Sequence, residues 1–499
     1  MDGAKRNWLW VGAIFLVGAG VARAQGIEAR INALLAKNEV QGASVGIAVV
    51  EVGPKGAVDV FSHNAGAALG PASCAKLLTT AAAFIKYGPH TTFKTELFWN
   101  GPAAPAADGA DAPLADVTIV GSGDPGLGDV KISAARGEAS TAAFDAWAQQ
   151  LTKRGIRRIR DVLVDDRVFD HEFVKESWPT ANGQRLSWFE APIGGLNFNA
   201  NCLDWLAKLT KDGAVRVELT PPTTYGTVTL KAKRAAQTQV WMYRGEPGTE
   251  GARRYELRGT VAASMTEAES VSVDDPGLWT GSVLKDRLTA AGIAVTGTVK
   301  RVDGAGALRG QWVGETKTEV IEIIRRANKN SVNMMAEGLC KRLGYDAAVA
   351  AGKNEPGSWP RGTGAVEAFV RSLGVPGDRV SLADGSGLSA DNKVAAGAFT
   401  AVLAHVAAVK EGELFVESLA TPSEDGTLKR RFRSMPAVAK AVHGKTGHIK
   451  GVSALSGYLD VNQRRFAFSI LTNNSKFPGD MNLWEEKVVE QVWEWAGGK

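Results

Sequence analysis

Cysteine is scarce in this chain. The three cysteines, Cys74, Cys202 and Cys340, are widely spaced and form no C-x-x-C pair, so neither a zinc site nor a dense disulfide framework is expected. An odd number leaves at least one thiol outside any disulfide. We expect Cys74 and Cys340, which lie in apolar stretches, to be small buried hydrophobic residues. No metal and no other cofactor is predicted.

Strong charge of one sign is also absent. The chain has 58 basic and 53 acidic residues, a formal net charge of +5, and no run of five or more basic residues. A nucleic-acid-binding protein would carry clustered positive charge, so no nucleic-acid partner is predicted. A hydrophobic content of 44% and a charged content of 22% are typical of a globular protein. A length of 499 residues exceeds one ordinary domain.

Long hydrophobic runs are missing too. The apolar stretch WLWVGAIFLVGAGVA occupies residues 8–22, fewer than the roughly 20 residues that a membrane-spanning helix needs. It follows Lys5 and Arg6 and precedes Ala22-Arg23-Ala24, an A-x-A cleavage site. We interpret residues 1–24 as a signal peptide cleaved after Ala24. The mature chain is therefore predicted to be periplasmic, without a transmembrane segment.

Several familiar motifs are absent or incomplete. There is no H-E-x-x-H and no G-x-S-x-G. Gly121, Gly123 and Gly126 spell G-x-G-x-x-G, but Pro125 interrupts it and the next helical pattern starts near Thr141, so no dinucleotide site is predicted. The six histidines are scattered, which leaves a Ser-His-Asp triad open without a local signature for it.

The chain changes character twice along its length. Residues 26–37 and 71–87 have helical spacing, with a strand pattern at 43–52 between them. After about residue 90, short alternating strands separated by Gly, Pro and Asp dominate, for example 116–120, 161–166, 215–220 and 227–233. Helical patterns resume at 276–292 and 318–344. The end of the chain holds strand patterns at 444–449, 453–461 and 464–474, then a helix from Trp484 to Ala496 with an apolar stripe of Trp484, Val488, Val492 and Trp495.

This pattern predicts an α/β domain that is divided by a mostly β insertion. The discontinuous domain would comprise residues 25–92 and 314–499. The insertion would comprise residues 93–313, interpreted as two nested domains.

The first motif with chemical meaning is Ser73-Cys74-Ala75-Lys76, an S-x-x-K sequence at the expected start of a helix. Three residues make about one helical turn, so the two side chains share a face. Serine is a poor nucleophile at neutral pH and needs a base. A lysine one turn away can serve if burial and a cationic neighbour lower its pKa.

Two further motifs follow in the chain. Ser331-Val332-Asn333 is S-x-N between two helical segments, and Lys445-Thr446-Gly447 is K-T-G opening a strand. Each motif alone arises often by chance. In this order, the three form the set of penicillin-binding proteins and serine β-lactamases. Ser331 follows Ser73 by 258 positions, a much longer interval than in class A β-lactamases, as expected for a chain with a large insertion.

With these motifs the chain resembles the class C low-molecular-mass penicillin-binding proteins, the D-alanyl-D-alanine carboxypeptidase/endopeptidase family. The other segments that carry the resemblance are VGSGDPGL at 120–127, VLVDDRVFD at 162–170, APIGGLNFNANC at 191–202, NKNSVNMMAE at 328–337, DGSGLSADN at 384–392, DGTLKRRF at 425–432 and HGKTG at 443–447. The resemblance implies a serine β-lactamase or transpeptidase-like domain split by a nested insertion. It also implies peptidoglycan stem peptides as substrate and β-lactam antibiotics as inhibitors.

The resemblance further implies catalytic roles. Ser73 would attack the carbonyl of the penultimate D-alanine, and Lys76 would take its proton. Ser331 would relay a proton to the leaving amine, while Asn333 would hold the substrate amide and Lys76. Lys445 would act in catalysis and in binding the terminal carboxylate.

The implied substrate contacts come from the third motif and from the insertion. Thr446 would bind the carboxylate beside Lys445, and the backbone N–H groups of Ser73 and His448 would form the oxyanion hole. Gly447 would let the substrate approach the backbone closely. Asp165 or Asp166 would reach the ammonium of the substrate side chain.

Two positions depart from the family pattern. His448 stands where the family usually has threonine, and Ala390 stands where an arginine commonly follows DGSGLS. We therefore expect a weaker preference for diaminopimelate over lysine in the stem peptide.

Two other functions are compatible with the motifs. A β-lactamase-like hydrolase would turn penicillin over rapidly, but the insertion is dispensable for a small drug. A non-catalytic wall-binding or β-lactam-sensing protein would not need the intact Ser73, Lys76, Ser331 and Lys445.

Overall fold

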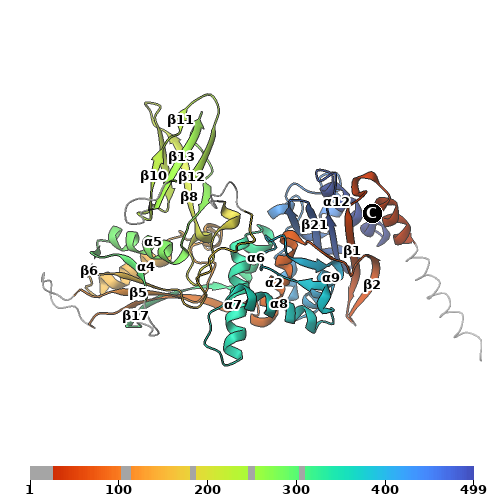
Figure 1. The fold of residues 1–499 in the computed structure, drawn as a ribbon, viewed down its shortest axis with the longest axis horizontal. Coiled ribbons are helices and arrows are strands. Elements are labelled where there is room, and N and C mark those ends of the chain that lie inside the picture. Colours follow the sequence, from red (N-terminus) through yellow and green to blue (C-terminus); the bar gives the residue numbers. More distant parts are fainter. Residues whose placement is uncertain are drawn as a thin grey trace, which may run out of the picture. The chain divides into compact units, whose positions relative to one another are not determined.

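The structure, a computed structural model, describes residues 26–54, 56–102, 114–179, 187–245, 253–302 and 309–498. The chain divides into two compact units (Figure 1). The first unit extends to Lys86 and adds Asn328–Ser331 and Val366–Lys499; the second holds Tyr87–Ala327 and Val332–Ala365. The predicted signal peptide, residues 1–24, lies outside the described residues. Within the described ranges, no helix combines the length and hydrophobicity that crossing a bilayer requires.

The first unit is built on a five-stranded antiparallel sheet in the order β2-β1-β22-β21-β20. Its strands are β1 (Ser44–Gly53), β2 (Gly56–His63), β20 (Val442–Ile449), β21 (Val452–Val461) and β22 (Arg464–Asn473). Strand β1 pairs with β22 from Ser44 opposite Asn473 to Val52 opposite Arg465. The two ends of the chain therefore complete one sheet, and β20 is left at its edge.

Helices cover both faces of this sheet. Side chains of a strand alternate between faces. Ile47 and Val49 of β1 belong to one buried cluster with Trp484 of α12 (Met481–Trp495). On the other face, the Tyr458 hydroxyl of β21 donates to the Leu403 carbonyl of α9 (Ala396–Ala408) at 2.8 Å. The predicted C-terminal helix is confirmed, and it begins three residues earlier, at Met481 rather than Trp484.

Shorter elements complete the first unit. They include a helical segment at 26–35, η1 (Asn38–Val40), η2 (Ala72–Ala75), α2 (Lys76–Tyr87), η7 (Gly377–Arg379), α10 (Gly412–Glu417), η8 (Gly426–Leu428), α11 (Pro436–Ala439) and a small sheet of β3 (Ala68–Leu69), β18 (Val380–Ser381) and β19 (Lys393–Ala395). Helix α2 is central, because every residue from Lys76 to Phe84 is buried. Such complete burial is unusual for a helix that begins with lysine, and it marks Lys76 as a residue with a specific partner.

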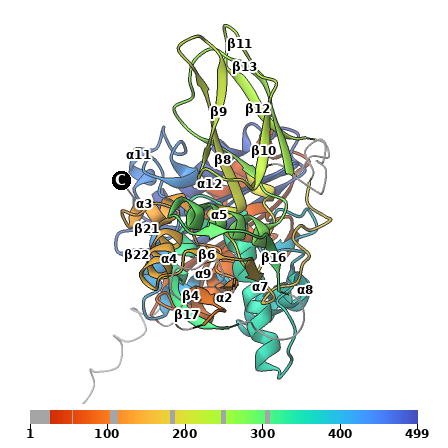
Figure 2. The ribbon, with the colours of Figure 1, turned by 90° about the vertical axis from the view of Figure 1, so that its left-hand side faces the viewer.

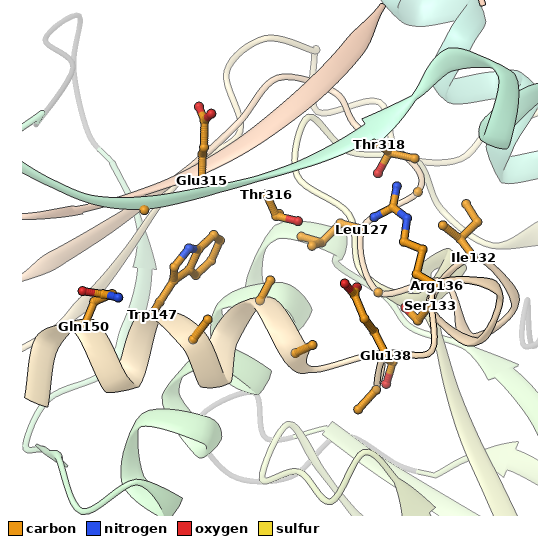
Figure 3. A pocket seen from close by; sticks show the side chains of 18 of the residues that line it. Leu127, Ile132, Ser133, Arg136, Glu138, Trp147, Gln150, Glu315, Thr316 and Thr318 are labelled. Carbon is orange, nitrogen blue, oxygen red and sulfur yellow. The ribbon is translucent and has the colours of Figure 1, made fainter. Parts of the chain in front are cut away.

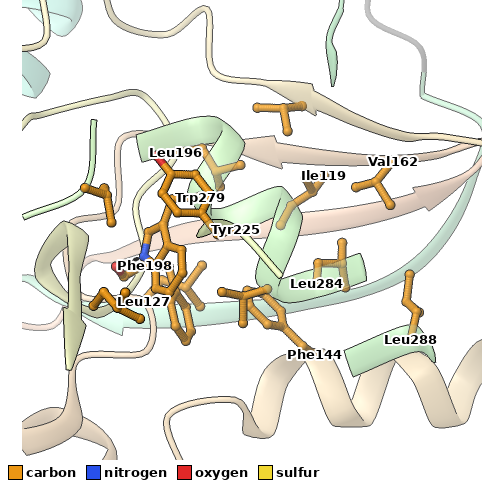
Figure 4. Packing of buried hydrophobic residues seen from close by; sticks show 14 of the residues in the cluster. Ile119, Leu127, Phe144, Val162, Leu196, Phe198, Tyr225, Trp279, Leu284 and Leu288 are labelled. Carbon is orange, nitrogen blue, oxygen red and sulfur yellow. Dashed lines mark hydrogen bonds between the residues drawn. The ribbon is translucent and has the colours of Figure 1, made fainter. Parts of the chain in front are cut away.

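The second unit contains a mixed five-stranded sheet in the order β16-β7-β5-β4-β17. Its strands are β4 (Thr92–Trp99), β5 (Val117–Gly121), β7 (Val162–Asp165), β16 (Val299–Arg301) and β17 (Gln311–Glu319). A large apolar cluster joins this sheet to α4 (Ala142–Lys153) and α5 (Pro276–Ala290), with Phe144, Phe198 and Trp279 among its aromatic rings (Figure 4). Other α-helices of this unit are α3 (Val130–Ala135), α6 (Val320–Lys329), α7 (Asn333–Ala350) and α8 (Trp359–Ser372), of which α6 and α8 continue into the first unit.

Further strands of the second unit form two more sheets, one of three strands in the order β14-β8-β9 and one of four strands in which β13 pairs with β10, β11 and β12 (Figure 2). They are β8 (Cys202–Leu209), β9 (Val215–Thr220), β10 (Gly226–Leu230), β11 (Lys233–Arg234), β12 (Gln239–Arg244), β13 (Arg253–Val261) and β14 (Glu269–Ser272). The fold class expected from the sequence, α/β with a mostly β insertion, is thus confirmed. The predicted domain boundaries, 25–92 and 314–499 around 93–313, stay a prediction. The division into compact units is a different one, because it also places residues 332–365 in the second unit.

Two smaller expectations concern cysteine and glycine. All three cysteines are buried, and no disulfide joins any of them in the described part of the chain. The G-x-G-x-x-G segment lies in the second unit, where Gly121 ends β5. A helix does open near it, at Val130, because the Asp129 carboxylate accepts hydrogen bonds from the N–H groups of Lys131 and Ile132. The sequence pattern missed this six-residue helix.

Candidate active site

The nucleophile motif lies at a tight turn. Ser73 belongs to the 3-10 turn η2, and Lys76 is the first residue of α2, so Ser73 precedes the α-helix rather than starting it. The Lys76 Nζ donates to the Ser73 Oγ at 2.9 Å and to the Ser386 carbonyl at 2.8 Å. Lys76 is fully buried. Its amine is therefore held against one hydroxyl, as a base for that hydroxyl would have to be.

The loop that supplies the Ser386 carbonyl is itself organised by a buried carboxylate. Asp384 is fully buried and accepts hydrogen bonds from the N–H groups of Gly387 and Ser389, both at 2.7 Å. Gly387 has a φ of +80°, and a Cβ there would lie 1.8 Å from the Ala72 carbonyl oxygen. Only glycine fits between this loop and the turn that carries Ser73.

The K-T-G motif lies on β20, the edge strand. The strand begins at Val442, so Lys445 is its fourth residue and the motif does not open the strand as expected. A Cβ on Gly447 would lie 2.5 Å from the Pro71 carbonyl oxygen. The Cys74 thiol donates a hydrogen bond to the Lys445 carbonyl oxygen at 3.2 Å. The third motif therefore packs directly against the turn of the first.

The outer edge of β20 presents backbone groups. Gly444 exchanges both of its backbone hydrogen bonds with Ala420, at 2.9 and 3.1 Å, on the side away from β21. Because alternate residues of a strand direct their N–H groups to the same edge, the N–H groups of Thr446 and His448 also face outward. The His448 side chain is exposed.

Ser331 and Lys445 form a second hydroxyl–amine pair. The Lys445 Nζ donates to the Ser331 Oγ at 2.9 Å and to the Thr446 carbonyl at 2.7 Å. Ser331 lies between α6 and α7, as expected, with a φ of +57°, a conformation that non-glycine residues adopt rarely and mostly at functional sites. Burial lowers the pKa of the Lys445 ammonium to about 8, because the charged form loses its water.

A threonine that the sequence analysis did not single out contacts this group. The Thr446 hydroxyl donates to the Thr427 hydroxyl at 2.9 Å. Thr427 is exposed and lies in η8, just after Asp425, whose carboxylate pairs with Lys329. The segment DGTLKRRF contributed to the family resemblance, but only the spacing D-G-T hinted that its threonine reaches the K-T-G strand.

The remaining predicted site residues lie in the second unit. Asn333 is the first residue of α7, and its Nδ2 donates to the Phe189 carbonyl at 2.7 Å. Asp165, at the end of β7, pairs with Arg167 at 2.8 Å. Asp166 is 1% exposed and pairs with Arg301 at 3.0 Å and with His171 at 3.2 Å. Both aspartates are thus bonded within their own unit.

Known proteins resemble this chain over most of its length. The family described as "D-Ala-D-Ala carboxypeptidase 3 (S13)" matches residues 27–490. The D-alanyl-D-alanine carboxypeptidase of Actinomadura sp. (strain R39) is 29% identical over 502 residues, covering 97% of this chain and 87% of that protein.

Solved structures show the same fold. Penicillin-binding protein 4 (dacB) of Haemophilus influenzae matches with a TM-score of 0.71 at 22% identity, over 93% of this chain and 98% of that chain. Its complex with a β-lactam matches with a TM-score of 0.68 at 20% identity, over 93% and 99% of the two chains. These findings confirm the resemblance and the fold class expected from the sequence.

Proposed function

Because the chain belongs to the D-Ala-D-Ala carboxypeptidase S13 family, we propose that it cleaves the terminal D-alanine from peptidoglycan stem peptides through an acyl-enzyme on Ser73. The protein is a serine-type carboxypeptidase, a hydrolase. One observation carries the assignment of Ser73: a buried lysine amine lies 2.9 Å from its hydroxyl. Release of free D-alanine from a soluble acyl-D-Ala-D-Ala peptide tests the activity directly, and no release would contradict it.

Acylation uses the first pair of side chains. The Ser73 Oγ attacks the carbonyl carbon of the penultimate D-alanine and gives its proton to the neutral amine of Lys76. The negative charge moves to the carbonyl oxygen, which the N–H groups of Ser73 and His448 stabilise. The outward direction of the His448 N–H on β20 supports its part in this oxyanion hole.

Collapse of the tetrahedral intermediate breaks the peptide bond. The amine of the terminal D-alanine leaves with the proton that Lys76 took from Ser73, which Ser331 relays to it, and the acyl group stays on Ser73 as an ester. Water then attacks this ester, Ser73 recovers its proton, and the shortened peptide leaves. The hydrogen bond from Lys445 to Ser331 supports a role for Ser331 in proton movement.

The terminal carboxylate needs positive charge and hydroxyl donors. We assign these to Lys445 and Thr446, with Thr427 as an additional hydroxyl, because the Thr446–Thr427 hydrogen bond places two hydroxyls side by side. Gly447 keeps the strand open to the substrate backbone. Asn333, at the start of α7, remains our candidate for the substrate amide and Lys76.

The contact of Asp165 or Asp166 with the ammonium of the substrate side chain also stays a proposal. Both carboxylates are bonded to arginines, so a substrate ammonium must share an oxygen with that arginine. Asp165→Asn and Asp166→Asn should each be compared for kcat/KM on matched peptides with and without the side-chain ammonium. If the carboxylate contacts the substrate, its substitution should lower kcat/KM only for the peptide that carries the ammonium group.

The low pKa of Lys445 predicts a pH dependence. Below about pH 8 the amine carries a proton and attracts the carboxylate; above it, the charge is lost. The profile of kcat/KM, which reports the free enzyme, should therefore fall above about pH 8. Lys445→Arg should move this fall to higher pH, because the guanidinium stays charged. For a substrate with a C-terminal amide, kcat/KM should not decrease in this way above about pH 8, because there is no carboxylate for Lys445 to attract. If kcat/KM of Lys445→Arg decreased at the same pH as in the wild type, the assignment would be contradicted.

Thr427→Val should weaken carboxylate binding without stopping catalysis. One hydrogen bond is worth about 0.5–1.5 kcal/mol, so we expect KM to rise by roughly two- to tenfold with kcat little changed. A C-terminal amide substrate serves as the comparison, and Ser423→Ala in the same loop is the matched control. Equal loss on both substrates would show that Thr427 acts only on the fold.

Related activities follow from the same acyl-enzyme. We propose that the enzyme also cleaves D-alanine cross-links as an endopeptidase, and that β-lactams acylate Ser73 and are released slowly. Rapid turnover of penicillin would instead favour the β-lactamase-like alternative. If the protein were neither labelled by penicillin nor able to hydrolyse the peptide, the non-catalytic alternative would be favoured. We place the mature enzyme in the periplasm, where its substrate lies, with residues 1–24 as its signal peptide.

A further inference from the structure

A separate cavity lies in the second unit. Its volume is about 500 Å³, and its walls come from α4, the segment 126–140 and strand β17 (Figure 3). This volume lies within the range typical of small-molecule sites. None of the residues that we place in catalysis belongs to its lining.

Small side chains create the space. Ala142, Ala143 and Ala146 of α4 form one wall, opposite β17. A Cβ on Gly314 of β17 would lie 2.7 Å from the Trp147 ring, so only glycine allows this ring to lie so close to the strand. In Figure 3 the Trp147 side chain extends from the helix toward β17.

Two polar side chains at this cavity have donors that are open to a bound molecule, since neither donor atom is among the fully buried, unpartnered ones. Trp147 is 2% exposed and Ser133 is 8% exposed, and both line the cavity. Within the described ranges, neither the Trp147 indole N–H nor the Ser133 hydroxyl makes a hydrogen bond. The indole ring of Trp147 is thus mostly buried while its N–H keeps access to the cavity, where an acceptor on a ligand would bind it. A bound molecule with an acceptor and hydroxyl groups would supply hydrogen-bond partners for both the Trp147 N–H and the Ser133 hydroxyl.

Most of the charged side chains around the cavity are engaged in hydrogen bonds, while Glu138 is exposed at its lining. Arg136 donates from Nε to Glu322 at 2.9 Å and from Nη2 to the Lys317 carbonyl at 3.1 Å. Arg154 donates to the Trp312 carbonyl at 2.9 Å. Glu315 points away from α4 in Figure 3 and pairs with Lys94 and Lys317. The exposed carboxylate of Glu138 would repel an anion, so the site favours a ligand without negative charge that carries many hydrogen-bonding groups.

We propose that this cavity binds an N-acetylated sugar of the peptidoglycan glycan strand. The acetamido carbonyl accepts from the Trp147 N–H, its methyl group packs on the alanines of α4, and sugar hydroxyls bond Ser133, Thr316 and Gln150. The inference rests on the proposed function, because peptidoglycan joins such sugars to the stem peptides. A second contact on the same molecule raises the local concentration of the peptide at the enzyme.

The first test is a titration that needs no catalysis. N,N′,N″-triacetylchitotriose is added to the full mature chain, and the indole ¹H–¹⁵N signals are followed, with Trp147→Phe identifying the Trp147 signal. We expect that signal to move with a Kd of about 1 mM. Thr316→Val and Ala146→Tyr should weaken binding by about fivefold or more, whereas Gln149→Ala, on the outside of α4, should not. No shift at about 10 mM sugar would overturn the proposal.

The second test compares two substrates. Ala146→Tyr fills the cavity and should lower kcat/KM severalfold on a sugar-linked stem peptide, while the rate on the same peptide without sugar stays at the wild-type value. Equal rates for wild type and variant on both substrates would overturn the proposal, as would a Trp147 shift caused by the sugar-free peptide. A wild-type chain that binds the sugar but hydrolyses neither substrate would contradict the proposed function alone.

Discussion

Ser73→Ala should abolish D-alanine release, lowering kcat by at least about a thousandfold. The variant keeps the oxyanion-hole N–H groups and the carboxylate site, but no atom remains that can form the ester. Its KM, or a Kd measured by competition, should stay near the wild-type value because the hydroxyl contributes little to binding. The measurement is D-alanine release with matched thermal unfolding curves. Ser381→Ala, exposed in β18 of the same unit, is the control and should retain full activity.

The result for Ser73→Ala separates two accounts. Retained activity would show that another residue is the nucleophile, which would reopen the Ser-His-Asp alternative. Loss of activity together with a lowered melting temperature would show only a folding defect. The small change in volume at this half-buried position favours an intact fold.

Lys76→Met should have the second-largest effect, lowering the acylation rate by about 10²–10⁴-fold. Methionine fills a similar volume but removes the only amine bonded to the Ser73 hydroxyl in the described residues. Acylation is measured as the rate of labelling by a fluorescent penicillin, which isolates the first chemical step. Lys86→Met, exposed in the last turn of the same helix, is the matched control.

A contrast with Lys445 sharpens this prediction. Lys445→Met should affect both KM and the acylation rate for a substrate with a free carboxylate, whereas Lys76→Met should act mainly on the rate. Near-normal acylation in Lys76→Met would show that the general base lies elsewhere. Equal effects of the two variants on KM would show that the two lysines do not have separate roles.

Local sequence patterns predicted the elements on which several motif residues lie, because the spacing of these residues fixes their side chains on one face or strand. Ser73 and Lys76 share a face over three residues, and the K-T-G strand and the S-x-N junction lie on the elements expected for them. The contacts that orient these groups were not predictable, because they depend on loops distant in sequence. Ser386 is 310 positions from Lys76, and Thr427 is 19 positions from Thr446. Neither contact leaves a periodic signal.

The second unit shows a different limit. Alternation of apolar and polar residues located strands such as β9, Val215–Thr220, correctly. The cavity beside β17 borders an irregularity, because the pairing of β17 with β4 shifts register between Trp312 and Gly314, which both line it. A bulge changes which face a residue occupies, and only the folded partner strand shows where it falls. The contact between Trp147 and Gly314 is therefore not predictable from the sequence pattern.

The most direct test of the acyl-enzyme account is to map the penicillin adduct by mass spectrometry. The mature chain is treated with penicillin, digested with trypsin, and the peptide of residues 56–76, which holds both Ser62 and Ser73, is fragmented. The account predicts the full mass of penicillin on Ser73, none on Ser62, and no adduct in Ser73→Ala. An adduct on any other residue, or labelling that persists in Ser73→Ala, would contradict it.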